Sequence, residues 1–129
     1  LLAHGLQALL CPNRPIRTDF AREGHRDGLL ALAAAEAGST LVANWGPYAT
    51  LHYLQRVERP AATMRLIAGF DGGERLRRLL SERKPGTKVY AYVRRTEARL
   101  LALLGRSFIL QEVFAGSAHV LFEILDSRR

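Results

Sequence analysis

The sequence TLVANWGP, residues 40–47, joins a short apolar run to a Gly-Pro turn. A few consecutive apolar residues between turn signals are typical of a strand that is buried on both faces. Pro47 suits the first turn of a helix, because the N–H that it lacks needs no partner there. The sequence therefore predicts a buried strand over 40–45, followed by a helix over 48–58.

The same alternation of strand and helix continues on both sides of this stretch. Helical spacing of leucines and turn signals predict the following elements: helices over 20–37, 71–82 and 96–104, and strands over 64–70 and 87–93. Two final apolar runs, 108–114 and 119–125, flank the small residues Ala-Gly-Ser-Ala and predict a β-hairpin.

Alternating strands and helices are typical of a parallel sheet that is covered on both faces. We therefore predict one α/β domain over 20–129, with a Rossmann-like three-layer α/β/α arrangement. Its sheet is expected to be mainly parallel, with the C-terminal hairpin at the edge.

The segment 1–19 is expected to be an N-terminal extension or linker. Its apolar opening, 1–10, is shorter than the roughly 20 apolar residues that cross a bilayer. Two interpretations stay open: it is the end of a membrane helix, or a short amphipathic helix that covers the core.

The chain is basic, with a formal net charge of +7, and only two of its basic residues are lysines, Lys84 and Lys88. A basic surface can face nucleic acid, anionic lipid or a phosphorylated substrate. The alternative is that most of these arginines form a solvated face and reflect a bias in base composition.

Several familiar kinds of site are excluded by their missing motifs. The glycines of 69–73 follow a strand, but the chain has no dinucleotide-binding or Walker fingerprint, and Asp71 and Glu74 would repel a phosphate. Helix capping by Asp71 explains them better. The histidines have no metal-ligand spacing, no nucleophile elbow is present, and Cys11 is the only cysteine. We expect no cofactor and no metal.

Ligands of open parallel sheets bind beyond the carboxyl ends of the strands. That rule selects the segments 44–48, 69–73 and 94–96. The residues expected to bind a ligand there are Asn44, Trp45, Tyr48 and His52, with Asp71 opposite. The aromatic rings can stack on a sugar or a lipid-linked carrier, and Asn44 can donate a hydrogen bond to it. The alternative is that Trp45 and its neighbour Tyr53 are core residues.

Residues 26–60 carry a family likeness, in particular Trp45, the Tyr53-Leu54-Gln55 triplet and the Arg59-Pro60 pair. This stretch resembles the C-terminal soluble domain of bacterial multi-pass membrane glycosyltransferases of the GT-C type, which are relatives of the protein O-mannosyltransferases. The chain departs from that pattern after Pro60, where the family tends to have an Asp-Val pair and this sequence has Ala-Ala.

The resemblance implies a membrane-anchored domain on the extracytoplasmic side, with transmembrane helices upstream as its partner. It also implies that the catalytic acidic residues lie in a loop outside this chain, so no catalytic residue is assigned here. We expect an accessory or substrate-positioning domain of an enzyme that uses lipid-phosphate sugar donors, lying near anionic lipid headgroups or the lipid-linked sugar.

One alternative function remains open, and it comes from another class. It is a small basic binding or regulatory module that recognises nucleic acid or a phosphorylated ligand, although nucleic acid is the less favoured partner. The arginines that would form its surface are Arg75, Arg77, Arg78, Arg94 and Arg95.

Overall fold

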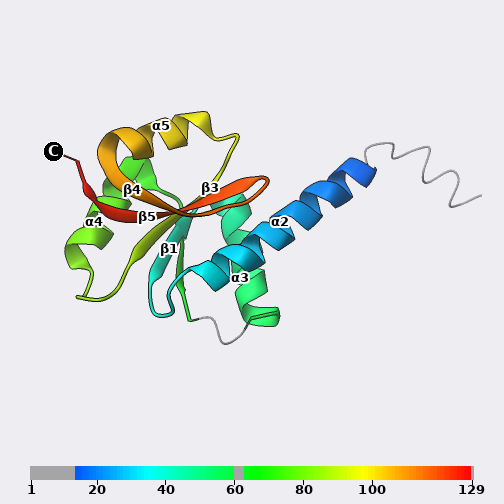
Figure 1. Ribbon diagram of the computed structural model, residues 1–129, viewed down its shortest axis with the longest axis horizontal. Coiled ribbons are helices and arrows are strands. Elements are labelled where there is room, and N and C mark those ends of the chain that lie inside the picture. The colour runs from blue at the N-terminus through cyan, green and yellow to red at the C-terminus, as the bar shows by residue number, and fades with distance from the viewer. Residues whose placement is uncertain (1–13, 60–62, 129) are drawn as a thin grey trace, which may run out of the picture.

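The computed structural model describes residues 14–59 and 63–128, which form an α/β fold around a five-stranded sheet (Figure 1). The sheet order is β2-β1-β3-β5-β4. The strands are β1 (Thr40–Ala43), β2 (Arg65–Ala68), β3 (Val89–Arg94), β4 (Phe108–Ala115) and β5 (His119–Ser127). The α-helices in the described part are α2 (Arg14–Ala34), α3 (Trp45–Val57), α4 (Glu74–Glu82) and α5 (Ala98–Ser107).

Helices cover both faces of the sheet, so the three-layer expectation agrees with the packing. Successive residues of a strand point to opposite faces. On one face Leu41 and Tyr92 belong to a buried cluster with Leu51 of α3 and residues of α2. On the other face Val42 belongs to a cluster with residues of α4 and α5. Figure 1 shows the same division, with α2 and α3 on one side and α4 and α5 on the other.

The expectation of a mainly parallel, Rossmann-like sheet is wrong, because the sheet is mixed. β1 pairs in parallel with β2 and with β3, whereas β3 pairs antiparallel with β5, and β5 with β4. The hairpin β4–β5 lies at one edge as predicted, but its second strand sits inside the sheet next to β3. The hairpin contributes two antiparallel pairings, β3–β5 and β5–β4, so the sheet has as many antiparallel as parallel pairings.

Helix α2 begins earlier than the sequence indicated, at Arg14 instead of residue 20. Pro15 lies in its first turn, the helical position that tolerates proline. The apolar segment 1–10 and Cys11 lie outside the described residues. Among the helices that the structure describes, none combines the length and the apolar character needed to cross a membrane.

The carboxyl ends of β1 and β3 lie side by side at one end of the sheet, where β5 begins. Ala43 pairs with Tyr92, and Arg94, the last residue of β3, pairs with His119, the first residue of β5. β1 ends at Ala43, earlier than predicted, because α3 already begins at Trp45. This end of the sheet therefore brings together side chains from α3, the end of β3 and the β4–β5 turn.

Candidate functional site

Four aromatic side chains of α3, Trp45, Tyr48, His52 and Tyr53, form what we call the aromatic surface. Trp45, Tyr48 and His52 are spaced three and four residues apart, Tyr53 follows His52 directly, and all four line one side of the helix. The rings of Trp45 and Tyr48 meet edge to face, with centroids 5.5 Å apart, and the Tyr48 and His52 centroids are 5.7 Å apart. With Arg56 these rings line an open depression of about 510 Å³.

Trp45 and Tyr53 are exposed and Tyr48 is half-buried, so the alternative that Trp45 and Tyr53 belong to the core is wrong. Their exposed fractions are 72% and 56%. The side of α3 that faces the core is formed instead by Leu51 and Leu54, which are fully buried. A tryptophan with this exposure leaves most of its apolar area in water.

The other two residues expected at the ligand site lie elsewhere. Asn44 precedes α3 and donates a hydrogen bond from Nδ2 to Oε1 of Glu97, at 2.8 Å. Asp71 is exposed, has a positive φ of 52°, and begins a single 3-10 turn, η1 (Asp71–Gly73). The residue that caps α4 is Gly73, so the helix-capping role predicted for Asp71 is wrong. Neither Asn44 nor Asp71 lines the aromatic depression.

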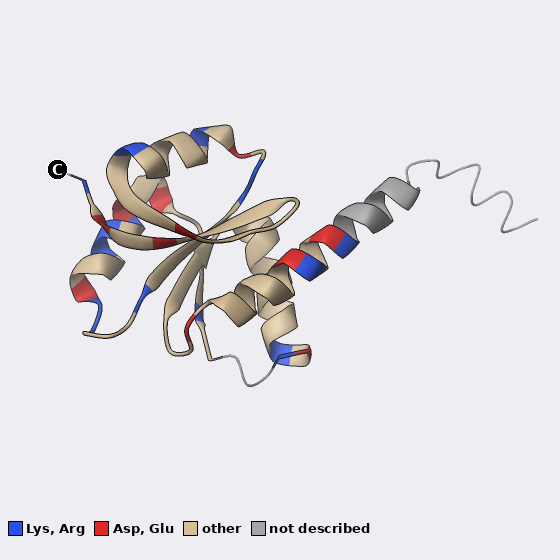
Figure 2. Ribbon diagram, viewed as in Figure 1, with Lys and Arg blue, Asp and Glu red and all other residues tan. Residues whose placement is uncertain are grey.

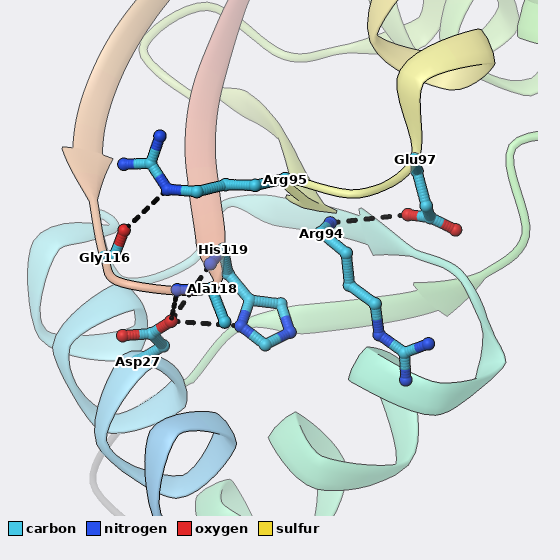
Figure 3. A network of polar contacts seen from close by, with 7 residues as sticks. All are labelled: Asp27, Arg94, Arg95, Glu97, Gly116, Ala118 and His119. Atoms are coloured by element: carbon cyan, nitrogen blue, oxygen red, sulfur yellow. Dashed lines mark hydrogen bonds and ion pairs between the residues drawn. The ribbon is translucent and has the colours of Figure 1, made fainter. Parts of the chain in front are cut away.

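A second, larger cavity of about 670 Å³ lies at the carboxyl ends of β1 and β3. Four segments far apart in the sequence line it: Glu23–Gly24 of α2, Pro47 and Thr50 of α3, Tyr92 and Arg94–Thr96 at the end of β3, and Ser117–His119 at the β4–β5 turn. Its polar network is drawn in Figure 3. Of the segments selected by the strand-end rule, 44–48 and 94–96 contribute to it, and 69–73 does not.

Asp27 and His119 form a buried pair, of which His119 lines this cavity. The Asp27 carboxylate is 2% exposed, and Oδ2 accepts hydrogen bonds from the backbone N–H groups of Ala118 and His119, each at 3.0 Å. The same oxygen lies 3.0 Å from Nδ1 of His119 (Figure 3). A carboxylate at Nδ1 fixes the orientation of the ring and leaves Nε2 for another partner.

Tyr92 packs flat against His119 and carries an unpartnered hydroxyl group. The two rings are stacked, with centroids 4.9 Å apart and planes 5° apart. Tyr92 is 1% exposed, and its hydroxyl oxygen has no hydrogen-bond partner among the described residues. Burial, together with the nearby Asp27 carboxylate, raises the pKa of this hydroxyl well above its ordinary value. The group therefore keeps its proton and can donate it in a hydrogen bond.

Two arginines at the end of β3 complete the cavity. Arg95 donates from Nε to the carbonyl oxygen of Gly116 at 2.8 Å, and its backbone N–H donates to Ala118 at 2.9 Å. The guanidinium of Arg94 lies directly over Gly46, where a Cβ atom would collide with it. Glu97 accepts a hydrogen bond from the backbone N–H of Arg94 at 3.3 Å and thereby holds the end of β3 in place.

The remaining arginines of the predicted basic surface lie elsewhere. Arg75 donates from its guanidinium to the carbonyl oxygens of Ala68 and Gly69 at the end of β2. Arg77 lies over the ring of Phe108, with 5.5 Å between the guanidinium carbon and the centroid. Arg75 and Arg78 line a third depression, beside β2. Figure 2 shows Lys and Arg distributed over α2, α4, α5 and the strand ends.

In the described part of the chain, no three His, Cys, Asp or Glu side chains are grouped so that they could hold a metal ion. Comparisons with protein-family models, curated proteins and solved structures find no match for this chain. The candidate sites therefore rest on their own geometry.

Proposed function

We propose that this chain is an accessory, substrate-positioning domain of a membrane glycosyltransferase that uses lipid-phosphate sugar donors. The aromatic surface is its sugar-binding site in this proposal. The observation that carries it is the 72% exposure of Trp45 beside Tyr48 and His52, at the end of a central parallel strand.

The chemistry of the aromatic surface suits a sugar ring. The C–H groups on one face of a sugar pack on an aromatic face, and its hydroxyl groups need polar partners at the rim. Trp45 and Tyr48 supply rings at right angles, and His52 and Arg56 supply polar atoms in the same depression. An open site of this form binds an exposed sugar and leaves a long lipid carrier outside.

The membrane setting of the proposal comes from the resemblance of residues 26–60 to the domain of GT-C enzymes. It places the domain on the extracytoplasmic side, attached to transmembrane helices upstream. The gene sequence tests this directly, because many hydrophobic spans should precede the codon for Leu1. A reading frame without such spans would contradict the membrane setting.

Sugar binding can be measured at Trp45 itself, because it is the only tryptophan in the chain. We expect titration with methyl mannoside, methyl glucoside and methyl galactoside to change the tryptophan emission saturably for at least one of them. Tyr48→Ala should weaken that response, because it removes the ring that packs against Trp45. Leu30→Ala is the matched control, since Leu30 is an exposed apolar residue of α2 outside the depression.

The intact membrane protein provides the decisive measurement. Trp45→Ala should strongly lower the rate of sugar transfer. It should leave the stability of the domain nearly unchanged, because the ring is exposed. Unchanged transfer by this variant, together with no sugar response in the isolated chain, would remove the aromatic surface as a sugar site.

A further inference from the structure

We propose that the cavity between α2, α3 and the β4–β5 turn is a separate binding site for a phosphate group of an organic phosphate ester or diphosphate. Its walls come from α2, α3, β3 and the β4–β5 turn. The aromatic surface lies on another side of α3 and shares no lining residue with the cavity. The cavity is therefore independent of the proposed sugar site.

The two arginines of the cavity have guanidinium N–H groups that no described residue accepts a hydrogen bond from. A guanidinium carries five N–H groups in a fork that matches phosphate oxygens. Arg95 uses Nε for the Gly116 carbonyl, and no described residue accepts a hydrogen bond from its two terminal nitrogens. The Arg94 guanidinium also makes no hydrogen bond or ion pair within the described residues, although it lines the cavity.

The acidic groups nearby are largely engaged. Asp27 is surrounded by three donors, two from the backbone and one from the His119 ring. Glu97 accepts from Asn44 and from the Arg94 backbone. Among the described residues, Glu23 is the one carboxylate in the cavity lining, against the two guanidinium groups of Arg94 and Arg95. The lining side chains therefore favour an anion.

Two polar groups of the cavity have no partner among the described residues. Nε2 of His119 makes no hydrogen bond to a described residue, and Figure 3 shows it on the side of the ring toward Arg94. The Tyr92 ring stacks on the His119 ring, and its hydroxyl group has no partner among the described residues. A buried hydroxyl without a hydrogen bond is costly. With Nδ1 bonded to Asp27, the protonated His119 ring would donate from Nε2 to a phosphate oxygen.

The size of the cavity indicates what carries the phosphate. About 670 Å³ lies within the range of pockets that hold small organic molecules and exceeds the need of a lone phosphate ion. The apolar atoms of Pro47 and Thr50 line one wall, where they can contact the organic part. A free phosphate ester and a lipid headgroup share this chemistry, and the experiment distinguishes them.

The test is a titration of the chain with inorganic pyrophosphate, followed by NMR of the arginine Nε–H and histidine ring signals. We expect saturable shifts at Arg94, Arg95 and His119. Arg94→Gln should weaken pyrophosphate binding about tenfold, as loss of a charge-assisted hydrogen bond does. Arg106→Gln is the control, because Arg106 is an exposed arginine in the last turn of α5 and makes the same change in net charge.

Three results would overturn the proposal: no saturable shift, shifts spread over all arginines, or equal weakening by Arg94→Gln and Arg106→Gln. Vesicles of phosphatidylglycerol, compared with phosphatidylcholine, identify the source of the phosphate. Binding to phosphatidylglycerol that Arg94→Gln weakens supports a lipid headgroup in the cavity. Pyrophosphate binding without vesicle binding supports a soluble phosphate ester. An unchanged sugar response of Trp45 in Arg94→Gln keeps the two sites distinct.

Discussion

Oδ2 of Asp27 lies 3.0 Å from both the backbone nitrogen and Nδ1 of His119. The two residues are 92 positions apart in the sequence. One carboxylate thereby fixes α2 to the first residue of β5 and orients the imidazole ring at the same time. The packing of α2 and the geometry of the cavity therefore depend on the same buried group.

Asp27→Asn should lower the free energy of unfolding by about 1–3 kcal/mol, because the buried backbone donors lose a charged acceptor. Chemical denaturation at neutral pH measures this change. Asp126→Asn is the matched control, since Asp126 is exposed and, within the described residues, accepts a hydrogen bond only from its neighbour Ser127. Similar, small effects of both variants would show that the Asp27 contacts contribute little.

Gly116→Ala should also destabilise the fold, because a Cβ at this position would collide with the Asp27 carboxyl group. We expect a loss of about 1–3 kcal/mol from the forced displacement. Gly105→Ala provides the contrast: nothing lies within 4 Å of its added Cβ, and it lies inside α5. That variant should gain about 0.5–1 kcal/mol from the helical preference of alanine. Opposite signs in thermal melts are the expected result.

Tyr92→Phe should change the stability of the protein at alkaline pH. The pKa of the Tyr92 hydroxyl is raised in the folded state, so the unfolded chain loses this proton first as the pH rises past about 10. Deprotonation then favours unfolding, and stability falls by up to about 1.4 kcal/mol per pH unit from this group alone. The loss between pH 9 and 11 should be smaller in Tyr92→Phe than in the wild type.

At neutral pH the same variant removes an unpartnered hydroxyl, so its stability should be maintained or rise by about 1 kcal/mol. Tyr90→Phe is the matched contrast, because the Tyr90 hydroxyl accepts a hydrogen bond from the backbone N–H of Glu36 at 3.1 Å. It should cost about 1 kcal/mol. If Tyr92→Phe costs as much, the Tyr92 hydroxyl has a partner in solution.

The elements of the fold could be predicted from local patterns, but their order in the sheet could not. The apolar run of β1 and the small-residue turn between β4 and β5 are signals that act within a few residues. Which strand β5 joins depends on contacts with β3, about 30 residues away in the chain. No local pattern distinguishes a hairpin with its second strand inside the sheet from one with its second strand at the edge.

The aromatic surface was accessible to sequence reasoning because its members lie on one side of one helix. The Asp27–His119 pair was not, because it joins two distant segments. One signal was available: Asp27 lies one helical turn before the buried residue Ala31 of α2. A carboxylate on a buried helix face needs a polar partner, so the position of Asp27 predicts a buried polar contact.

Trp45→Ala should alter the stability of the chain by no more than about 0.5 kcal/mol, because the side chain is 72% exposed. A tryptophan in the core would cost about 3–5 kcal/mol on the same truncation. Leu51→Ala is the matched comparison on the buried side of α3 and should show the large loss. Thermal melts of both variants separate a binding residue from a packing residue. A large fall for Trp45→Ala would contradict its assignment to the aromatic surface.

Gly46→Ala should separate the stability of α3 from the geometry of the cavity. Gly46 lies in the first turn of the helix, so alanine should stabilise it by about 0.5–1 kcal/mol. The new Cβ would collide with the Arg94 guanidinium, a flexible group that can move away at little cost. The melting temperature should therefore stay constant or rise while pyrophosphate binding weakens, because the displaced guanidinium no longer lies at the cavity wall. Gly105→Ala, which raises helix stability far from Arg94, should leave binding unchanged. Equal pyrophosphate affinity in both glycine variants would mean that the position of Arg94 over Gly46 does not matter for the anion.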